Sequence, residues 1–169
     1  MYRVAGIDGS TSRTGIAIFE DGEYVEHILI DYHTMTKFEN RFPLMVQEII
    51  DYLSKWDVDK IIMEKSILKS NIDTVQKLSM LAGAIMFYAN SHDIIFEYPV
   101  PTEWRKVIGL SQGRVKREIL KAEAIRAVKL TYNFDLTDDE AEAILIARSG
   151  YDLPQIKITA SDVADEVWG

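Results

Sequence analysis

The order of strand-like and helix-like hydrophobic patterns along the chain limits its fold more than any other feature. Residues 2–30 contain three strand-like stretches, the last two joined by a turn at Asp21-Gly22. Apolar spacings of three and four residues then predict two helices, and each is followed by a short apolar strand. These four segments span residues 37–55, 59–64, 70–90 and 94–100. An antiparallel meander followed by helical crossovers predicts a mixed five-stranded sheet flanked by helices, an α/β fold.

The second half of the chain is predicted to be mainly helical. Its helical segments span residues 102–108, 115–130 and 137–147. Thr137 stands three residues before Glu140, a capping box that predicts where the last of these helices begins. We therefore expect one domain over residues 1–150 and a C-terminal tail over 151–169, for which the sequence carries no clear signal.

Composition excludes several kinds of site. The chain has 169 residues and no Cys, so it can form no disulfide, thiolate zinc site or cysteine nucleophile. Its three His residues are scattered and form no HExxH pair, so a metal site must be built from carboxylates. The sequence shows neither a long apolar run nor the features of a signal peptide, and we expect a cytoplasmic protein without a membrane segment.

Charge is unevenly distributed. The whole chain has 19 Lys and Arg against 27 Asp and Glu, a net charge of -8 that argues against nucleic-acid binding. Residues 103–129 nevertheless carry eight basic side chains against three acidic ones. Taken alone, such a basic segment is more typical of a solvated helix than of a surface that follows phosphates.

Acidic residues occur where chemistry is expected in such a fold. Asp8 ends the first strand, Glu64 ends the apolar strand at 59–64, and Asp139 and Glu142 share one face of the last helix. Asp8 and the helix acids have an ordinary explanation, since Asp before Gly is a common turn residue and acids favour a helix N-terminus. Glu64 is stronger evidence, because a charge at the end of an apolar strand loses hydration unless it is paired or bound to metal. Together, two at the carboxyl ends of strands and one pair on a helix that can lie against the sheet, they predict an all-oxygen site suited to Mg²⁺ or Mn²⁺. Two such ions could support hydrolysis of a phosphodiester.

Four motifs occur in the order found in RuvC-like Holliday junction resolvases, especially those of phages and prophages, and the chain resembles this family over residues 2–150. The motifs are GIDGSTSRTGIAIF, IIMEKSILKSNIDTVQKLSMLAGAI, PTEWRKVIGL with VKREILKAEAI, and DDEAEAILIA. The resemblance implies an RNase H-like fold, a homodimer that uses the helix at 70–90, and cleavage of four-way or other branched DNA. It also implies two Mg²⁺ or Mn²⁺ ions per active site, held by Asp8, Glu64, Asp139 and Glu142 as catalytic ligands.

The resemblance and the charge pattern suggest DNA contacts around these acids. They are the polar turn with Ser10, Thr11 and Arg13, the basic helix with Lys116, Arg117 and Lys121, and Ile67 in the place of an aromatic wedge. In the last helix, the helical repeat predicts that Asp138 and Glu140 turn away from the face that carries Asp139. We expect Trp104 and Arg105 to pack the short helix at 102–108.

Three other functions compete with this interpretation. GIDGSTSRTGIAI also resembles the first phosphate loop of sugar kinases and actin-like ATPases, but their two lobes need roughly twice this length or more. An RNase H-like nuclease acting on structured RNA and a junction-binding protein without catalysis both stay open.

Overall fold

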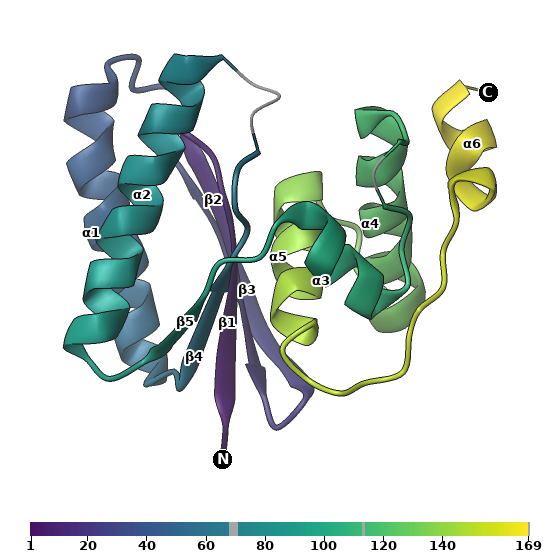
Figure 1. The fold of residues 1–169 in the computed structure, drawn as a ribbon, viewed down its shortest axis with the longest axis horizontal. Coiled ribbons are helices and arrows are strands. Elements are labelled where there is room, and N and C mark those ends of the chain that lie inside the picture. The colour runs from purple at the N-terminus through teal and green to yellow at the C-terminus, as the bar shows by residue number, and fades with distance from the viewer. Residues whose placement is uncertain (68–70, 113, 169) are drawn as a thin grey trace.

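The computed structural model describes residues 1–67, 71–112 and 114–168, and its centre is one five-stranded sheet (Figure 1). The strands are β1 (Arg3–Gly9), β2 (Arg13–Glu20), β3 (Glu23–Asp31), β4 (Lys60–Met63) and β5 (Ile95–Glu97). Their order is β3-β2-β1-β4-β5. The first three strands pair antiparallel, whereas β4 pairs parallel with both β1 and β5. The predicted mixed sheet flanked by helices is confirmed.

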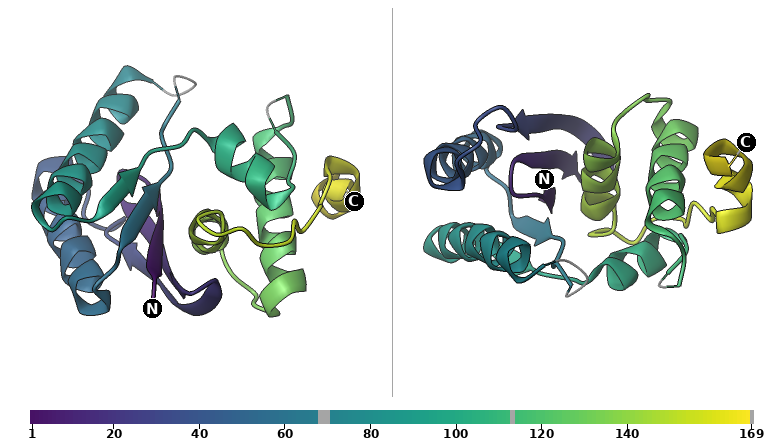
Figure 2. Two further views of the ribbon diagram at one scale, coloured as in Figure 1. Left: turned by 60° about the horizontal axis from the view of Figure 1, so that its bottom comes forward. Right: turned by 90° about the horizontal axis from the view of Figure 1, so that it is seen from above.

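Helices cover the two faces of the sheet unequally. On one face lie α1 (Phe38–Trp56) and α2 (Ile72–Ser91). On the other lie α3 (Pro101–Ile108), α4 (Arg117–Tyr132), α5 (Asp138–Arg148) and α6 (Ala160–Trp168). Seen from above, α5 lies directly on the sheet, α4 packs outside α5, and α6 packs outside α4 (Figure 2). Within the described part of the chain, every helix is too short or too polar to cross a membrane.

The predicted boundaries differ from the observed ones at a few ends. Strand β5 stops at Glu97 rather than continuing to residue 100, because Pro99 and Pro101 lack the N–H that a ladder needs. Pro101 instead opens α3, where its missing N–H costs nothing. The basic helix begins at Arg117, with Lys116 as its N-cap. The predicted start of the helix at residue 70 lies outside the described residues.

Two glycines let α5 lie directly on the sheet. A Cβ at Gly6 would overlap backbone atoms of Ala143 and Ala147, and a Cβ at Gly15 would overlap the Asp139 carbonyl. The helix could not approach the sheet this closely over larger residues. This approach brings the first turn of α5 over the carboxyl end of β1.

The period-two alternation of β1 assigns its side chains to two separate cores. Ala5 and Ile7 pack with α1 and α2, whereas Val4 packs with the helices of the other face. Asp8 lies two residues beyond Gly6 and therefore projects toward α5. On the α5 side, the row of β1 side chains thus ends in the Asp8 carboxylate.

The segment after residue 150 contains the helix α6, for which the sequence carried no clear signal. Ile158 and Val163 are buried in the same core as α4 and α5. The Tyr151 hydroxyl donates a hydrogen bond of 2.8 Å to the Tyr2 carbonyl. Helix α6 has nine residues and only Val163 is buried, so its apolar stripe is too short to stand out in the sequence.

Candidate active site

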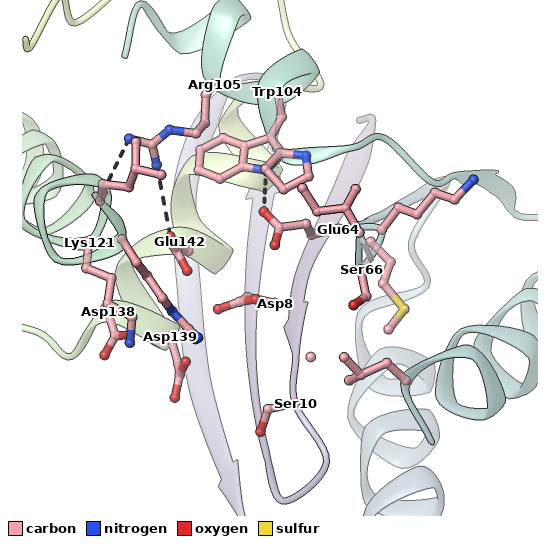
Figure 3. Close-up of a pocket in the computed structure, with 18 of the residues that line it drawn as sticks. Asp8, Ser10, Glu64, Ser66, Trp104, Arg105, Lys121, Asp138, Asp139 and Glu142 are labelled. Carbon is pink, nitrogen blue, oxygen red and sulfur yellow. Dashed lines mark hydrogen bonds and ion pairs between the residues drawn. The ribbon is translucent and has the colours of Figure 1, made fainter. Parts of the chain in front are cut away.

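The Asp8 and Glu64 carboxylates lie side by side because their strands are parallel neighbours. Ile7 pairs with Met63 in the ladder between β1 and β4. One residue later, the Glu64 N–H donates a 3.1 Å hydrogen bond to the Ile7 carbonyl. Asp8 and Glu64 therefore take the same place along two adjacent strands, and both project toward α5 (Figure 3).

Helix α5 supplies the other two predicted ligands. The Thr137 N–H and hydroxyl donate hydrogen bonds of 3.0 and 2.7 Å to Glu140 Oε2, so the predicted capping box is confirmed. This cap uses the Glu140 carboxylate at the helix start, where His27 Nε2 also lies 3.6 Å from it. Asp139 and Glu142 line the cavity that Asp8 and Glu64 line.

The cavity measures about 520 Å³ and opens at the carboxyl edge of the sheet. Besides the four carboxylates, its lining includes five residues that the sequence predicted as DNA contacts: Ser10, Thr11, Ile67, Arg117 and Lys121. The other two such residues face different partners. Arg13 Nε pairs with Asp31 Oδ2 at 3.1 Å, and Lys116 Nζ lies 4.3 Å from the centre of the Trp168 ring.

Burial raises the pKa values of all four acids, and repulsion within the cluster adds to the shift at Asp8 and Glu142. Burial raises the pKa of Asp8 well above its usual value, and the charges of Glu142, Glu64 and Asp139 raise it further. Burial, followed by the charge of Glu64, raises the pKa of Glu142 to about 7. The pKa values of Glu64 and Asp139 are also raised, chiefly by burial. The cluster therefore favours protons or cations that neutralise it.

The sequence-based interpretation of Trp104 and Arg105 missed their contacts with these acids. Both residues are buried, as expected for packing residues of α3. However, Trp104 Nε1 donates a 2.7 Å hydrogen bond to Glu64 Oε2, and Arg105 Nη1 lies 4.0 Å from Glu142 Oε1 (Figure 3). The sequence could have indicated these contacts, because an indole N–H and a guanidinium that are buried both need polar partners.

The sequence model of the family described as crossover junction endodeoxyribonuclease RuvC matches residues 4–149. The chain belongs to this RuvC family. The RuvC of Stenotrophomonas maltophilia is 23% identical over an alignment of 178 positions, which covers 100% of this chain and 99% of the relative. The RuvC of Thermomicrobium roseum is 22% identical over 149 residues, which cover 86% of this chain and 90% of the relative.

Solved structures of this kind have the same fold. RuvC of T. thermophilus, in complex with a Holliday junction substrate, matches with a TM-score of 0.71 at 13% identity, over 88% of this chain and 92% of that one. Fowlpox virus resolvase, in complex with Holliday junction DNA, matches with a TM-score of 0.61 at 16% identity, over 88% and 95%. The predicted RNase H-like fold and RuvC resemblance are confirmed, whereas the closer relation to phage members stays a prediction.

The donor set fits the divalent metal ions that the RuvC resemblance implies. Four carboxylates from three elements line one cavity, and hard cations prefer oxygen ligands of this kind. Across residues 1–67, 71–112 and 114–168, however, no three Asp, Glu or His side chains lie at the spacing needed to ligate one ion. The acids therefore fit in type and location, and side-chain movement inward would have to complete the ligand shell.

Asp138 corrects one expectation about the last helix. The helical repeat predicted that it turns away from Asp139, but Asp138 also lines the cavity. Its Oδ2 pairs with Lys121 Nζ of the neighbouring helix α4. As the first residue of α5, Asp138 can reach across to this ammonium group, so its charge is already compensated within the protein.

Proposed function

We propose that this chain is a divalent-metal-dependent endonuclease that cleaves four-way or other branched DNA junctions by hydrolysing phosphodiester bonds. The observation that carries the proposal is the convergence of Asp8, Glu64, Asp139 and Glu142 on one cavity in a chain of the RuvC family. The likeness of the fold to two resolvases solved with Holliday junctions supports the choice of substrate.

The four carboxylates are the proposed ligands of two Mg²⁺ or Mn²⁺ ions. Bound there, the ions would supply activation of the attacking water and stabilisation of the leaving oxygen. The residues of the chain hold the site in place, Asp8 and Glu64 from adjacent strands and the other two acids from α5. Because the four charges repel one another, the cluster favours cations over any neutral occupant.

The DNA is proposed to lie across the cavity mouth. Arg117 and Lys121 line the cavity from α4 and would attract the phosphates on either side of the scissile bond. Ser10 and Thr11 form the turn between β1 and β2, beside Asp8. Ile67 also lines the cavity and is 39% exposed, so its side chain is free to unstack a base step at the branch.

A homodimer is the proposed assembly, with the outer face of α2 as its contact. Met80 is 52% and Phe87 is 74% exposed, and a Cβ at Gly83, between them, would meet open space. A large apolar face with a small central residue suits close approach of another helix. Symmetric cleavage of a four-way junction needs two sites related by a twofold axis, so the proposed occupant is a second copy of this chain.

Sedimentation tests the dimer directly. The parent chain should sediment as a dimer at micromolar concentration, and Phe87→Glu should shift it to monomer because the charge would be buried in the contact. Glu39→Gln, an exposed position in the first turn of α1, is the control and should leave the dimer intact. A parent that remains monomeric even on junction DNA would refute the assembly.

The activity is tested with labelled four-way, forked and linear duplex DNA and a structured RNA, each incubated with Mg²⁺ and resolved strand by strand. We expect paired cuts in opposing strands of the four-way junction, and no cleavage when EDTA removes the metal. Equal cleavage of linear duplex would contradict a junction-specific enzyme. Preferred cleavage of the RNA would support the RNase H-like alternative instead, and junction binding without cleavage would support the non-catalytic one.

A further inference from the structure

Two adjacent residues of α3 contact two different acids of the proposed metal site. Consecutive helical residues point about 100° apart, so Trp104 and Arg105 can reach different targets from one turn. Trp104 contacts Glu64 at the end of β4, and Arg105 faces Glu142 on α5 (Figure 3). Helix α3 thus bridges the two elements whose relative position determines the shape of the site.

The indole of Trp104 restrains Glu64. Its N–H donates to Glu64 Oε2 at 2.7 Å, and the Trp104 side chain is packed in the core beneath α4 and α5. A side chain that is 2% exposed has little freedom to follow a moving carboxylate. The bond therefore holds Glu64 by Oε2 and leaves the other oxygen, Oε1, for a cation.

Arg105 is anchored by groups outside the site. Its Nε donates to the Ser111 carbonyl at 2.8 Å, and its Nη2 donates to the Leu120 carbonyl at 3.3 Å and to Glu123 Oε2 at 2.6 Å. Nη1 faces Glu142 Oε1 at 4.0 Å, beyond hydrogen-bond distance. The guanidinium is thus close enough to reduce the repulsion around Glu142 without occupying its oxygen.

Glu123 is the residue that holds Arg105 at this distance. It is fully buried, and its Oε2 also accepts a 3.2 Å hydrogen bond from the Ser111 N–H. Its Oε1 has no hydrogen-bond partner among the residues that the structure describes. A buried ion pair with an unsatisfied oxygen is a poor source of stability. Glu123 does, however, compete with Glu142 for the same guanidinium.

We propose that Trp104, Arg105 and Glu123 are positioning residues for the metal ligands Glu64 and Glu142. Trp104 orients Glu64, and Glu123 retains Arg105 so that Glu142 is charge-compensated but still free to bind a cation. The inference rests on the proposed function, because it assumes that these two acids are metal ligands. The proposed roles explain why Trp104 and Arg105 lie next to the acidic cavity.

The first test compares Trp104→Phe with Trp56→Phe. Both remove an indole, but Trp56 lies at the end of α1, on the opposite face of the sheet. Mn²⁺ binding is measured by titration calorimetry without DNA, and cleavage of a four-way junction is measured against Mg²⁺ concentration. For Trp104→Phe we expect about tenfold weaker Mn²⁺ binding, as is usual when a group that orients a ligand is removed, and a lower kcat at unchanged KM. Trp56→Phe should match the parent.

The second test removes the charge of Glu123 without changing its shape. In Glu123→Gln, Arg105 is released toward Glu142, and Mn²⁺ binding should weaken several-fold. The double variant Glu123→Gln with Arg105→Gln removes the competing cation, so Mn²⁺ binding should recover in part, short of the parent because Glu142 also loses its charge compensation. A merely structural role would instead make the double variant at least as defective as the single one. Circular dichroism melting establishes that each variant is folded, and Trp104→Phe remains the test if Glu123→Gln does not fold.

Failure of the inference is distinguishable from failure of the proposed function. If Trp104→Phe and Glu123→Gln are folded and bind Mn²⁺ as the parent does, the positioning roles are refuted. That conclusion requires that Asp8→Asn, measured in the same experiment, loses both metal binding and cleavage. If Asp8→Asn itself cleaves normally, the metal site is wrong and the positioning roles fail with it.

Discussion

The two faces of the sheet use the same strands for different purposes. On the α1 and α2 side, the strands bury aliphatic side chains such as Ile7 against Ile49 and Leu53 of α1 and Ile85 of α2. On the α5 side, the alternate residues of β1 include Gly6 and Asp8. Both faces therefore carry a hydrophobic core, but only the α5 face also accepts buried charge and close backbone contact. Substitutions on the α1 and α2 side should therefore change stability without changing the chemistry, whereas substitutions on the α5 side can change both.

The largest expected effect is on the α5 face. Asp8→Asn and Glu64→Gln should each lower the cleavage rate by at least about 10³-fold, about 4 kcal/mol in activation free energy, because each removes a ligand charge. Junction binding should persist or tighten, since repulsion of phosphate falls. Asp51→Asn, an exposed acid of α1, is the control for the loss of one negative charge. Near-parental cleavage by either site variant in Mg²⁺ would contradict the assigned site.

The opposite face should show the reverse pattern. Leu53→Ala empties a fully buried position of α1 and should cost about 2–5 kcal/mol of unfolding free energy. Leu44→Ala, at a half-exposed position of the same helix, should change it by less than about 0.5 kcal/mol. Urea titration measures both, and the cleavage rate per folded molecule should be unchanged. A rate loss in folded Leu53→Ala would show that the faces are coupled.

The acidic cluster should make stability without metal depend on pH. The pKa of Glu142 is raised from its ordinary value of 4.5 to about 7, and the pKa of Asp8 is raised in the same direction. The folded state therefore binds more protons than the unfolded state, and unfolding free energy should fall as pH rises from 4.5 to about 7. A loss on the order of 1–3 kcal/mol is expected from Glu142.

Melting experiments in EDTA and in Mg²⁺ measure this dependence. Mg²⁺ should raise the Tm more at pH 8 than at pH 5, because only the charged cluster binds it well. Glu142→Gln should flatten the pH dependence in EDTA, and Leu44→Ala should leave it as in the parent. An equal Tm in EDTA at pH 5 and pH 8 would show that burial does not raise the pKa values of these acids.

The sequence predicts one half of the site better than the other. Short apolar strand patterns are enough to place Asp8 and Glu64 at strand ends, and the Thr137 capping box defines the start of α5. The ion pair of Arg105 with Glu123 joins residues 18 positions apart on different helices, and no periodicity connects them. The side chain of Asp138 likewise follows a partner on α4 rather than the helical repeat.

Removing basic side chains of α4, at the edge of the α5 face, should have a smaller effect, and only on DNA binding. Lys116→Ala combined with Lys121→Ala should weaken junction binding and lower the log-log salt slope by about 0.9 for each phosphate that is no longer neutralised. The effect is limited because Lys121 already pairs with Asp138, and Lys116 lies against Trp168. Lys129→Ala, at the far end of α4 and paired with Asp135, is the control. Unchanged affinity and slope in the folded double variant would place the DNA path elsewhere.

The smallest expected effect comes from the residue next to a proposed ligand. Asp138→Asn breaks a partly exposed ion pair with Lys121, which should change the unfolding free energy by less than about 1 kcal/mol. Cleavage should be only mildly affected, and junction binding should tighten slightly because Lys121 is released and one negative charge is removed. Asp139→Asn, one residue away, should abolish cleavage because its carboxylate is a proposed metal ligand. Rates of both variants, measured against Mg²⁺ concentration, decide the register of α5. If Asp138 proved indispensable and Asp139 did not, the ion pair with Lys121 would have to open when metal binds, and the site would have to be rebuilt around Asp138.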